Sequence, residues 1–302
     1  MTIPEEDRQS HVAAIVTALV VTFLWSTSWV LIRWGLDNES LEPLTFAAIR
    51  YGLAAAVLAG WVLSRRSLRQ SVRSIDRRMM MNLLLLGVLF YSVTQGAQFV
   101  AIDNQPAATT SLILSLTPLL VAGFGAVTLG ERSSSRQWIG TALVAMGAWA
   151  YFTGDLGATV VGMTAALVSL AANVASGLLG RQVNRSEAVP PVVVTAISMW
   201  IGAVVLVGAG AVTEGMPSIS ARAWSIIAWL AVVNTALAFS LWNLSLRRLT
   251  AVESAGINNT MLIQIAILAW IYLSEPPGLA GLAGIVLVSI GVFLTQAARR
   301  QR

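Results

Sequence analysis

Ten long apolar runs separated by short polar loops constrain this chain more than any other feature. Each run is close to the ~20 residues that an α-helix needs to cross a bilayer. In chain order the runs cover residues 11–34, 43–64, 79–101, 106–129, 137–153, 158–180, 189–212, 223–246, 251–273 and 279–297. Only 11% of the residues are charged, and the mean hydropathy is +0.75. We therefore expect an all-α integral membrane protein with ten transmembrane helices. Because the loops are too short to fold separately, residues 1–302 form one membrane domain.

The positive charges occur in alternate loops. All 19 basic residues are arginines, and most of them lie at the amino end, in every second loop and in the tail. Positive charge in short loops marks the cytoplasmic side of a membrane protein. We expect a multi-pass protein of a bacterial inner membrane with cytoplasmic N- and C-termini. Because these loops face anionic lipid headgroups, the basic pI near 10.6 predicts no nucleic-acid partner.

The two halves of the chain repeat one unit. Shifting the second half back by 144 residues aligns the fourth and fifth runs with the ninth and tenth without a gap, so that Ser115 meets Asn259 and Gly140 meets Gly284. Five helices per unit is an odd number, so the second unit enters the membrane from the opposite face. The pattern predicts two inverted five-helix repeats, residues 11–153 and 158–297, an arrangement typical of secondary transporters.

Glycines line one face of the fifth and tenth runs. Gly140 and Gly147 in the first half match Gly284 and Gly291 in the second. Small residues at such spacings let helix backbones approach closely. We expect these faces to pack within the chain, with homodimerisation as the alternative, so the protein is a monomer or a homodimer.

Several short motifs follow one another at ordered spacings along nearly the whole chain. They are the Trp-Ser pair at 25–26, FAAIRY at 46–51, SLTPLL at 115–120, LGER at 129–132 and ALAFSLWN at 236–243. In this order they resemble the drug/metabolite transporter superfamily, EamA type, and within it the aromatic amino acid exporters. The resemblance implies a secondary transporter that exports neutral, aromatic amino acids by alternating access. One departure is that Met261 and Leu262 stand where the first half has Thr117 and Pro118, so we expect no proline break in the ninth helix.

Polar and aromatic side chains inside the runs line up on helical faces. Such groups are costly in lipid and usually face a bundle interior or a wet cavity. We expect the substrate cavity to be lined by Trp25, Tyr91, Gln95, Gln98, Ser115, Asn173, Trp242 and Asn259. The alternative for each side chain is contact between helices, worth about 0.6 kcal/mol on average.

Arg50 is the ionised residue that lies well inside a run. It sits about 10 Å from the outer end of the second helix, at 1.5 Å per residue. One interpretation is that its guanidinium binds a substrate carboxylate. The other is a gate or anchor that reaches outward to acidic side chains, which would be Asp37, Glu39, Glu42 or Asp103.

Residue types that carry catalysis or proton transfer are missing from the middle of the runs. The acidic residues lie at run ends, and the single histidine, His11, lies at the cytoplasmic edge of the first run. The sequence offers no acid–base pair for an enzyme and no metal-binding cluster. We expect a non-enzymatic transporter with a small-molecule substrate, the lipid bilayer around it, no cofactor and no coupling proton. An exporter of other small metabolites or drugs and a passive channel or facilitator are the alternatives.

Overall fold

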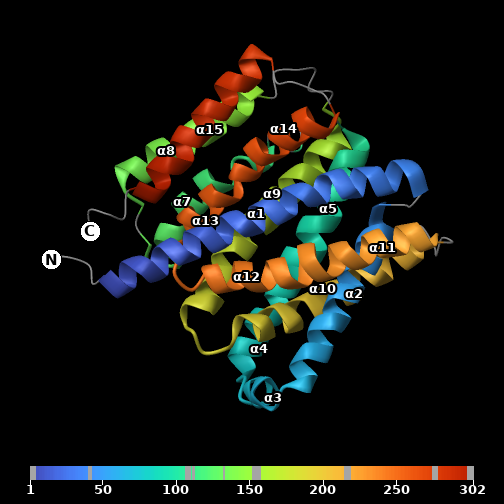
Figure 1. Ribbon diagram of the computed structural model, residues 1–302. Coiled ribbons are helices and arrows are strands. Elements are labelled where there is room, and N and C mark those ends of the chain that lie inside the picture. The colour runs from blue at the N-terminus through green and yellow to red at the C-terminus, as the bar shows by residue number, and fades with distance from the viewer. Residues whose placement is uncertain are drawn as a thin grey trace.

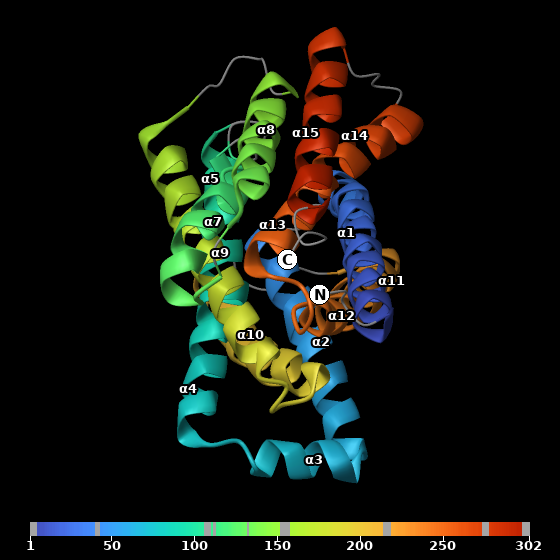
Figure 2. The ribbon, with the colours of Figure 1, turned by 90° about the vertical axis from the view of Figure 1, so that its left-hand side faces the viewer.

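The computed structural model describes residues 5–39, 43–105, 110, 113–131, 133–151, 158–213, 219–273 and 278–297. Every regular element within those residues is a helix, so the all-α expectation is confirmed. The elements are α1 (Glu5–Glu39), α2 (Pro43–Ser64), α3 (Arg66–Arg73), α4 (Arg77–Leu86), η1 (Gly87–Val93), α5 (Thr94–Asn104), α7 (Thr117–Thr128), α8 (Ser135–Tyr151), α9 (Val160–Arg185), α10 (Pro191–Thr213), α11 (Ala221–Trp229), η2 (Leu230–Leu237), α12 (Ala238–Ser245), α13 (Ala251–Asn258), α14 (Thr260–Leu273) and α15 (Leu279–Ala297). They gather into one bundle, with α8 and α15 together at one end and the short α3 at the other (Figures 1 and 2).

Six of the described helical segments are long and apolar enough to cross a membrane by length and composition. They are Gln9–Ser28, Leu44–Ser64, Arg77–Gln98, Val160–Arg185, Pro191–Val212 and Ala221–Ser245. Thr117–Thr128 and Leu279–Thr295 are apolar but shorter. The fourth and ninth runs are each divided in the structure, so their separate pieces are too short to cross alone. The ten-helix count therefore stays a prediction.

Helix starts follow capping residues that the sequence supplies. The Thr159 hydroxyl accepts a hydrogen bond from the Gly162 amide at the start of α9, and the Ser220 hydroxyl accepts one from the Ala223 amide at the start of α11. Thr250 begins α13 with a complete capping box. Such caps satisfy amides that would otherwise lack partners at a helix start. They fix where the sixth, eighth and ninth runs begin.

Two long helices each contain a π-helical segment. α4, η1 and α5 form one continuous rod, and α11, η2 and α12 form another. Shifting η1 by 144 residues gives 231–237, which coincides with η2. The Thr94 and Thr235 hydroxyls each donate to a carbonyl five residues earlier, the spacing of a π-helix. Because π-helical turns are rare and concentrate at functional sites, their matching positions make these two rods candidate parts of the functional site.

η1 packs closely against α10 through two glycines. A Cβ on Gly87 would lie 2.4 Å from the carbonyl oxygen of Ser198, and a Cβ on Gly202 would lie 2.3 Å from the Cβ of Tyr91. No larger residue fits at either position without moving a backbone. This contact fixes the depth of Tyr91 in the bundle.

The fourth and ninth runs break near their middles. α7 begins at Thr117, and Pro118 occupies its first turn, where a missing N–H leaves no helical bond unmade. In the ninth run, α13 ends at Asn258 and α14 begins at Thr260. The proline break is absent there as expected, but the helix is interrupted nevertheless, which the sequence reasoning did not anticipate.

Side-chain hydrogen bonds give the reason for the second break. The Asn259 amide donates to the Ser115 carbonyl at 3.2 Å, and the Thr260 hydroxyl donates to the Ile257 carbonyl at 2.7 Å. Polar side chains that bond to backbone compete with the helical ladder. An asparagine and a threonine here interrupt the helix where the first half uses a proline.

Helices from the two halves pack against one another throughout the bundle. α2 lies against α10, α5 against α9, α7 against α13, and α1 against both α12 and α14. α8 lies along α15 at the upper end of the bundle (Figure 1). Every one of these pairs joins an element before residue 152 to one after residue 157. The substrate path expected from sequence would therefore run between the halves.

Close backbone contact holds α8 against α15. A Cβ on Gly140 would lie 2.6 Å from the carbonyl oxygen of Gly291, and a Cβ on Gly147 would lie 2.7 Å from that of Gly284. The packing role expected for these glycines is confirmed. These faces meet inside one chain and are therefore occupied.

Candidate functional site

Six aromatic side chains from α1, α2, η1 and α12 form one group, which we call the aromatic cluster. Its members are Trp25, Tyr51, Phe90, Tyr91, Phe239 and Trp242. The ring centroid of Phe239 lies 4.8 Å from that of Trp25 and 5.0 Å from that of Tyr91. Trp25 also contacts Trp242 at 5.2 Å. The structure thus brings together three of the residues expected in the cavity, through a phenylalanine that the sequence analysis did not select.

Parts of this cluster remain available for contact. Tyr91, Phe239 and Trp242 are buried, whereas Trp25 and Phe90 are only half-buried. The indole N–H of Trp25 has no hydrogen-bond partner among the described residues, although its nitrogen is buried. An unpaired polar hydrogen in such surroundings is costly unless water or a ligand accepts it. Clustered aromatic rings with a spare donor can hold an apolar or aromatic group.

Three further candidates meet at the two helix breaks. The Asn259 amide donates to the Ser115 carbonyl, and the Asn173 amide on α9 lies 3.5 Å from the Thr117 hydroxyl at the start of α7. Ser115 and Asn259 are buried, and Asn173 is half-buried. These contacts tie α7, α9 and the α13–α14 break together. They agree with either interpretation of the three residues, helix contact or cavity lining.

Gln95 and Gln98 lie on α5 and stand apart from the other candidates. Both side chains are half-buried, and neither amide bonds to a described residue. An amide inside a membrane helix needs a partner because lipid supplies none. Contact with water in a cavity satisfies this need, which favours the cavity interpretation for these two residues.

Arg50 is buried, with 6% of its surface exposed. Its Nε donates to the Thr235 hydroxyl at 2.7 Å, and its Nη2 lies 3.5 Å from the Ser28 hydroxyl. The guanidinium carbon also lies 5.6 Å from the ring centroid of Tyr51, a member of the aromatic cluster. The side chains of Asp37, Glu39, Glu42 and Asp103 lie outside the described part of the structure. The described contacts of Arg50 point toward η2 and α1.

Asn234 is a residue that the sequence reasoning missed. It is fully buried on η2, beside Thr235, and its amide nitrogen donates to the Leu24 carbonyl and the Thr27 hydroxyl of α1. Its carbonyl oxygen Oδ1 has no described partner. A lone amide in the middle of the eighth run was the available signal, because Asn is costly in lipid.

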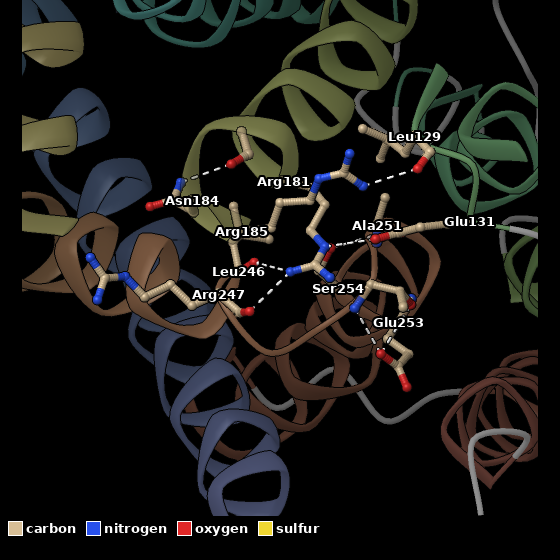
Figure 3. Close-up of polar contacts among 12 residues, drawn as sticks. Leu129, Glu131, Arg181, Asn184, Arg185, Leu246, Arg247, Ala251, Glu253 and Ser254 are labelled. Atoms are coloured by element: carbon tan, nitrogen blue, oxygen red, sulfur yellow. Dashed lines mark hydrogen bonds and ion pairs between the residues drawn. The ribbon is translucent and has the colours of Figure 1, made fainter. Parts of the chain in front are cut away.

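A group of polar contacts joins the two halves of the chain at the end of the bundle that carries the arginine-rich loops. We call Glu131, Arg181 and the backbone groups that they bind the polar latch. The Arg181 Nε donates to Glu131 Oε1 at 2.8 Å, and its Nη1 donates to the Leu246 and Arg247 carbonyls (Figure 3). The other oxygen of Glu131 accepts the backbone N–H of Ala251 at 3.0 Å. Both charged side chains are largely buried, with exposed fractions of 13% and 15%. The carboxylate of Glu131, from the first half, thereby binds Arg181 and Ala251 of the second half, and Arg181 also binds the Leu246 and Arg247 carbonyls.

Other contacts strengthen this end. The Arg185 guanidinium donates to the Leu129 carbonyl at 2.9 Å (Figure 3). His11 Nε2 lies 3.5 Å from Glu253 Oε1, and the Glu253 side chain is fully buried. The sequence placed Arg181, Arg185 and Glu253 only as charges at run ends. Their partners come from distant parts of the chain, so only the structure reveals the latch.

A surface groove lies between α1 and α11. It has a volume of about 260 Å³ and is lined by Leu31, Ser225, Ile226 and Trp229. Leu31 is about one helical turn from Ser28, and Trp229 is a little more than one turn from Asn234, at 3.6 residues per turn. The groove therefore lies on the same two helical rods as Ser28 and Asn234, and none of its lining residues belongs to the polar latch.

Comparison with known proteins places the chain among transporters. The sequence profile of the EamA-like transporter family matches residues 12–153 and 160–296. The chain is 28% identical to a probable terminal-alkyne amino-acid exporter of Streptantibioticus cattleyicolor, over 91% of this chain and 93% of that protein. It is 26% identical to a probable amino-acid metabolite efflux pump of Escherichia coli K12, over 95% and 96% of the two chains.

Two further similarities are more distant. The chain is 23% identical to an S-adenosylmethionine/S-adenosylhomocysteine transporter of Chlamydia muridarum, over 91% of this chain and 89% of that protein. A crystal structure with 18% identity superposes with a TM-score of 0.77, over 96% of this chain and 99% of that one. At this identity the superposition shows a shared fold only.

Proposed function

This chain belongs to the EamA-like transporter family, and from that premise we propose that it exports neutral amino acids, aromatic ones in particular, by alternating access. Membership makes it a multi-pass membrane transporter. Two of its relatives are named as exporters or efflux pumps of amino acids or their metabolites, which supports amino acids as the substrate class. We place the protein in a bacterial inner membrane with both termini in the cytoplasm, because the arginines lie in alternate loops.

The aromatic cluster is the observation that carries the aromatic preference. Trp25, Phe239 and Trp242 come from α1 and α12, which belong to different halves of the chain. Aromatic pairs add about 0.5–1.5 kcal/mol beyond the area that they bury. A substrate ring entering between these side chains gains that stacking, whereas an aliphatic side chain gains only burial.

Ten spans in two inverted repeats, residues 11–153 and 158–297, are the architecture that we propose in the membrane. Three observations support it: helices of the two halves pack in pairs, η1 and η2 occur at equivalent positions, and the family profile matches the chain twice. A site between inverted repeats is reached from either side when one repeat rocks against the other.

The polar latch and the groove support alternating access. Glu131 and Arg181 hold the two halves together at the arginine-rich end, while the groove lies between α1 and α11 and includes no latch residue. A carrier needs one end closed while the other is open. With the arginine-rich loops in the cytoplasm, as we propose, the latch corresponds to a state closed toward the cytoplasm.

Flux measurements in proteoliposomes test the proposal. We expect saturable flux of phenylalanine, tyrosine and tryptophan, with smaller flux of alanine and none of lipophilic cations. Counterflow separates a carrier from a channel, because trans-substrate accelerates a carrier and has no such effect on a pore. Equal flux without counterflow would support a passive channel or facilitator. Preference for S-adenosylmethionine or for drugs over every neutral amino acid would support the exporter of other metabolites.

A further inference from the structure

We propose that Arg50 and Asn234 form a binding site for the zwitterionic head of an α-amino acid, with Arg50 binding the carboxylate and Asn234 Oδ1 accepting from the ammonium group. We call Ser28, Arg50, Asn234 and Thr235 the head-group site. The inference rests on the proposed function and specifies which part of the substrate is recognised and by which atoms. It applies to free amino acids and to any substrate that carries the same zwitterion.

The carboxylate half follows from the hydrogen bonds of Arg50. A guanidinium has five N–H groups. Thr235 Oγ1 accepts from Nε and Ser28 Oγ accepts from Nη2, which leaves Nη1 and one hydrogen of Nη2 without a described partner. Both acceptors are oriented for this, because the Thr235 hydroxyl donates to the Leu230 carbonyl and the Ser28 hydroxyl donates to the Leu24 carbonyl.

Charge balance points to an anion at the same place. Arg50 is buried, and no carboxylate among the described side chains lies within ion-pair distance of it. A cation inside a membrane bundle is costly without a partner. The free Nη1 and Nη2 hydrogens match a carboxylate in bidentate geometry. A substrate carboxylate would neutralise the guanidinium each time it binds.

The ammonium half follows from the orientation of the Asn234 amide. Its nitrogen faces two oxygen atoms, the Leu24 carbonyl and the Thr27 hydroxyl. Turning the amide over would bring Oδ1 against the Leu24 carbonyl, which cannot donate, so the assignment of nitrogen and oxygen is fixed. Oδ1 is buried and unpaired. A buried carbonyl oxygen without a donor suits a ligand that brings N–H groups.

The contacts for the carboxylate and for the ammonium group belong to one site because they are linked through one backbone atom, the Leu24 carbonyl oxygen. The Asn234 amide and the Ser28 hydroxyl both donate to the Leu24 carbonyl, and Ser28 accepts from Arg50. Asn234 and Thr235 are also neighbours on η2. The cationic and the acceptor groups therefore lie a few hydrogen bonds apart, as the two charges of an amino acid require.

The side chain of a bound amino acid has a defined direction. Arg50 lies over the ring of Tyr51, whose centroid is 5.9 Å from that of Tyr91 and 6.2 Å from that of Phe239. A head group held by Arg50 therefore places its side chain next to the aromatic cluster. The head-group site and the aromatic cluster together recognise both ends of an aromatic amino acid.

Ligand analogues test the carboxylate contact and the ammonium contact separately. The probes are L-phenylalanine, L-phenylalaninamide, which lacks the carboxylate charge, and 3-phenylpropionate, which lacks the ammonium group. We expect purified wild-type protein to bind phenylalanine at least tenfold more tightly than either analogue, measured by ligand-induced thermal stabilisation and by competition with labelled phenylalanine. Arg50→Gln should abolish the preference over the amide. Asn234→Ala should abolish the preference over phenylpropionate.

Matched variants separate recognition from folding. Thr17→Val removes a hydroxyl of the same helix that donates only to the Ala13 carbonyl, away from the head-group site, so it should retain both preferences. Arg50→Lys keeps the charge without the bidentate fork and should retain part of the preference over the amide. The inference is overturned if the wild type does not discriminate among the three probes, if Arg50→Gln keeps its preference over the amide, if Asn234→Ala keeps its preference over phenylpropionate, or if Thr17→Val loses the same preferences.

Failure of the proposed function has a different signature. In that case the wild type binds and transports no neutral amino acid in the panel, whatever the variants do. If the wild type transports phenylalanine but tolerates loss of either charge, the function stands and the head-group site is refuted. Wild-type selectivity shows whether both charges are recognised, and the variants show whether Arg50 and Asn234 are the residues that recognise them.

Discussion

At the scale of single residues, Trp242 is the aromatic side chain best suited to probing the substrate. It contacts Trp25 at 5.2 Å but lies at the edge of the aromatic cluster, whereas Phe239 touches most of the other members. Because Trp242 is also buried against α1, the effect of its loss on flux is compared at equal amounts of folded protein.

We predict that Trp242→Ala reduces flux of phenylalanine more than flux of alanine. The lost stacking of about 0.5–1.5 kcal/mol corresponds to a difference of about two- to tenfold. The measurement is initial flux of each amino acid in proteoliposomes with equal amounts of protein. Trp149→Ala removes an indole of α8 that is 64% exposed, and it should change neither flux. Equal losses for both substrates in Trp242→Ala would mean that the residue serves packing alone.

At the scale of helices and loops, two kinds of contact join the halves of the chain. Glycine contacts hold α8 against α15, and the polar latch joins the loop after α7 to α9 and α13. The glycine contact is apolar and brings two backbones together, so we expect it to persist during a transport cycle. The second consists of charged hydrogen bonds, which can break and form again during a transport cycle.

The close glycine contact between α8 and α15 predicts that a larger side chain there lowers the stability of the protein. Gly291→Leu should lower the unfolding temperature of the purified protein, since overpacking costs about 1–3 kcal/mol and here the new side chain meets the backbone of Gly140. Gly208→Leu is the matched control, because nothing lies within 4 Å of a Cβ at that position of α10. If both variants melt like the wild type, the α8–α15 contact is looser than described.

The latch can be compared with its counterpart in the repeat. A shift of 144 residues relates Arg181, Arg247 and Glu131 to Asp37, Asp103 and Glu275. Three acidic residues cannot form the ion pair that Arg181 and Glu131 form. If the halves are inverted repeats, these three positions do not reproduce the Arg181–Glu131 ion pair at the opposite end, and we expect the resting protein to be closed at the latch end.

We predict that Glu131→Gln opens the latch. Losing a charged hydrogen bond costs about 1.5–3 kcal/mol, which corresponds to an increase of about tenfold or more in the open fraction. The reporter is Ser254→Cys, a buried position beside the latch in a protein without cysteine (Figure 3). Its labelling by a thiol reagent should accelerate by a similar factor. Glu187→Gln, which removes an exposed partner of Arg247, should leave the rate unchanged. Equal rates in all three proteins would show that the latch does not control access.

At the scale of the whole molecule, the sequence predicts the membrane topology and the driving force of transport. The alternation of arginine loops predicts which loops face the cytoplasm, and the lack of mid-run carboxylates predicts how transport is driven. Both are properties of the complete chain in a membrane.

Single cysteines test the topology. We expect cysteines at positions 38 and 215 to react with an impermeant thiol reagent added to intact cells, and cysteines replacing Ser71 or Ser134 to react only after lysis. The native chain contains no cysteine, so no background reacts. Reversed labelling would overturn the orientation, and mixed labelling would overturn the ten-span count.

Transport should proceed without an imposed proton gradient. A neutral amino acid carries no net charge, and the sequence places no Asp or Glu in the middle of a run, so we expect flux down the substrate gradient at equal pH and little effect of membrane potential. The measurement is uptake into liposomes at equal pH and then under gradients of either sign. Accumulation beyond equilibrium under one gradient would demonstrate coupling. Glu253 and His11 would then be examined first, because the structure pairs them in a buried position.

Sequence reasoning located part of the candidate site and missed the rest for a definable reason. Trp25, Tyr91 and Trp242 were selected because large or polar residues in apolar runs stand out individually, and the structure brings them together. Phe239 and Asn234 were not among the expected cavity residues, because the sequence alone does not show which side chains they meet. Their importance depends on partners that distant segments supply.

The sequence by itself determined the helical class, the family and the packing glycines, because hydropathy, motif order and small-residue spacing are local properties of the chain. Only the tertiary structure decided where helices bend and which polar groups meet. The π segments, the break at Asn259 and the latch all depend on contacts between the two halves. Arg50 meets Thr235 across 185 residues and Asn234 meets Leu24 across 210, and no local pattern specifies such pairs, because they form only when the faces of packed helices are brought together.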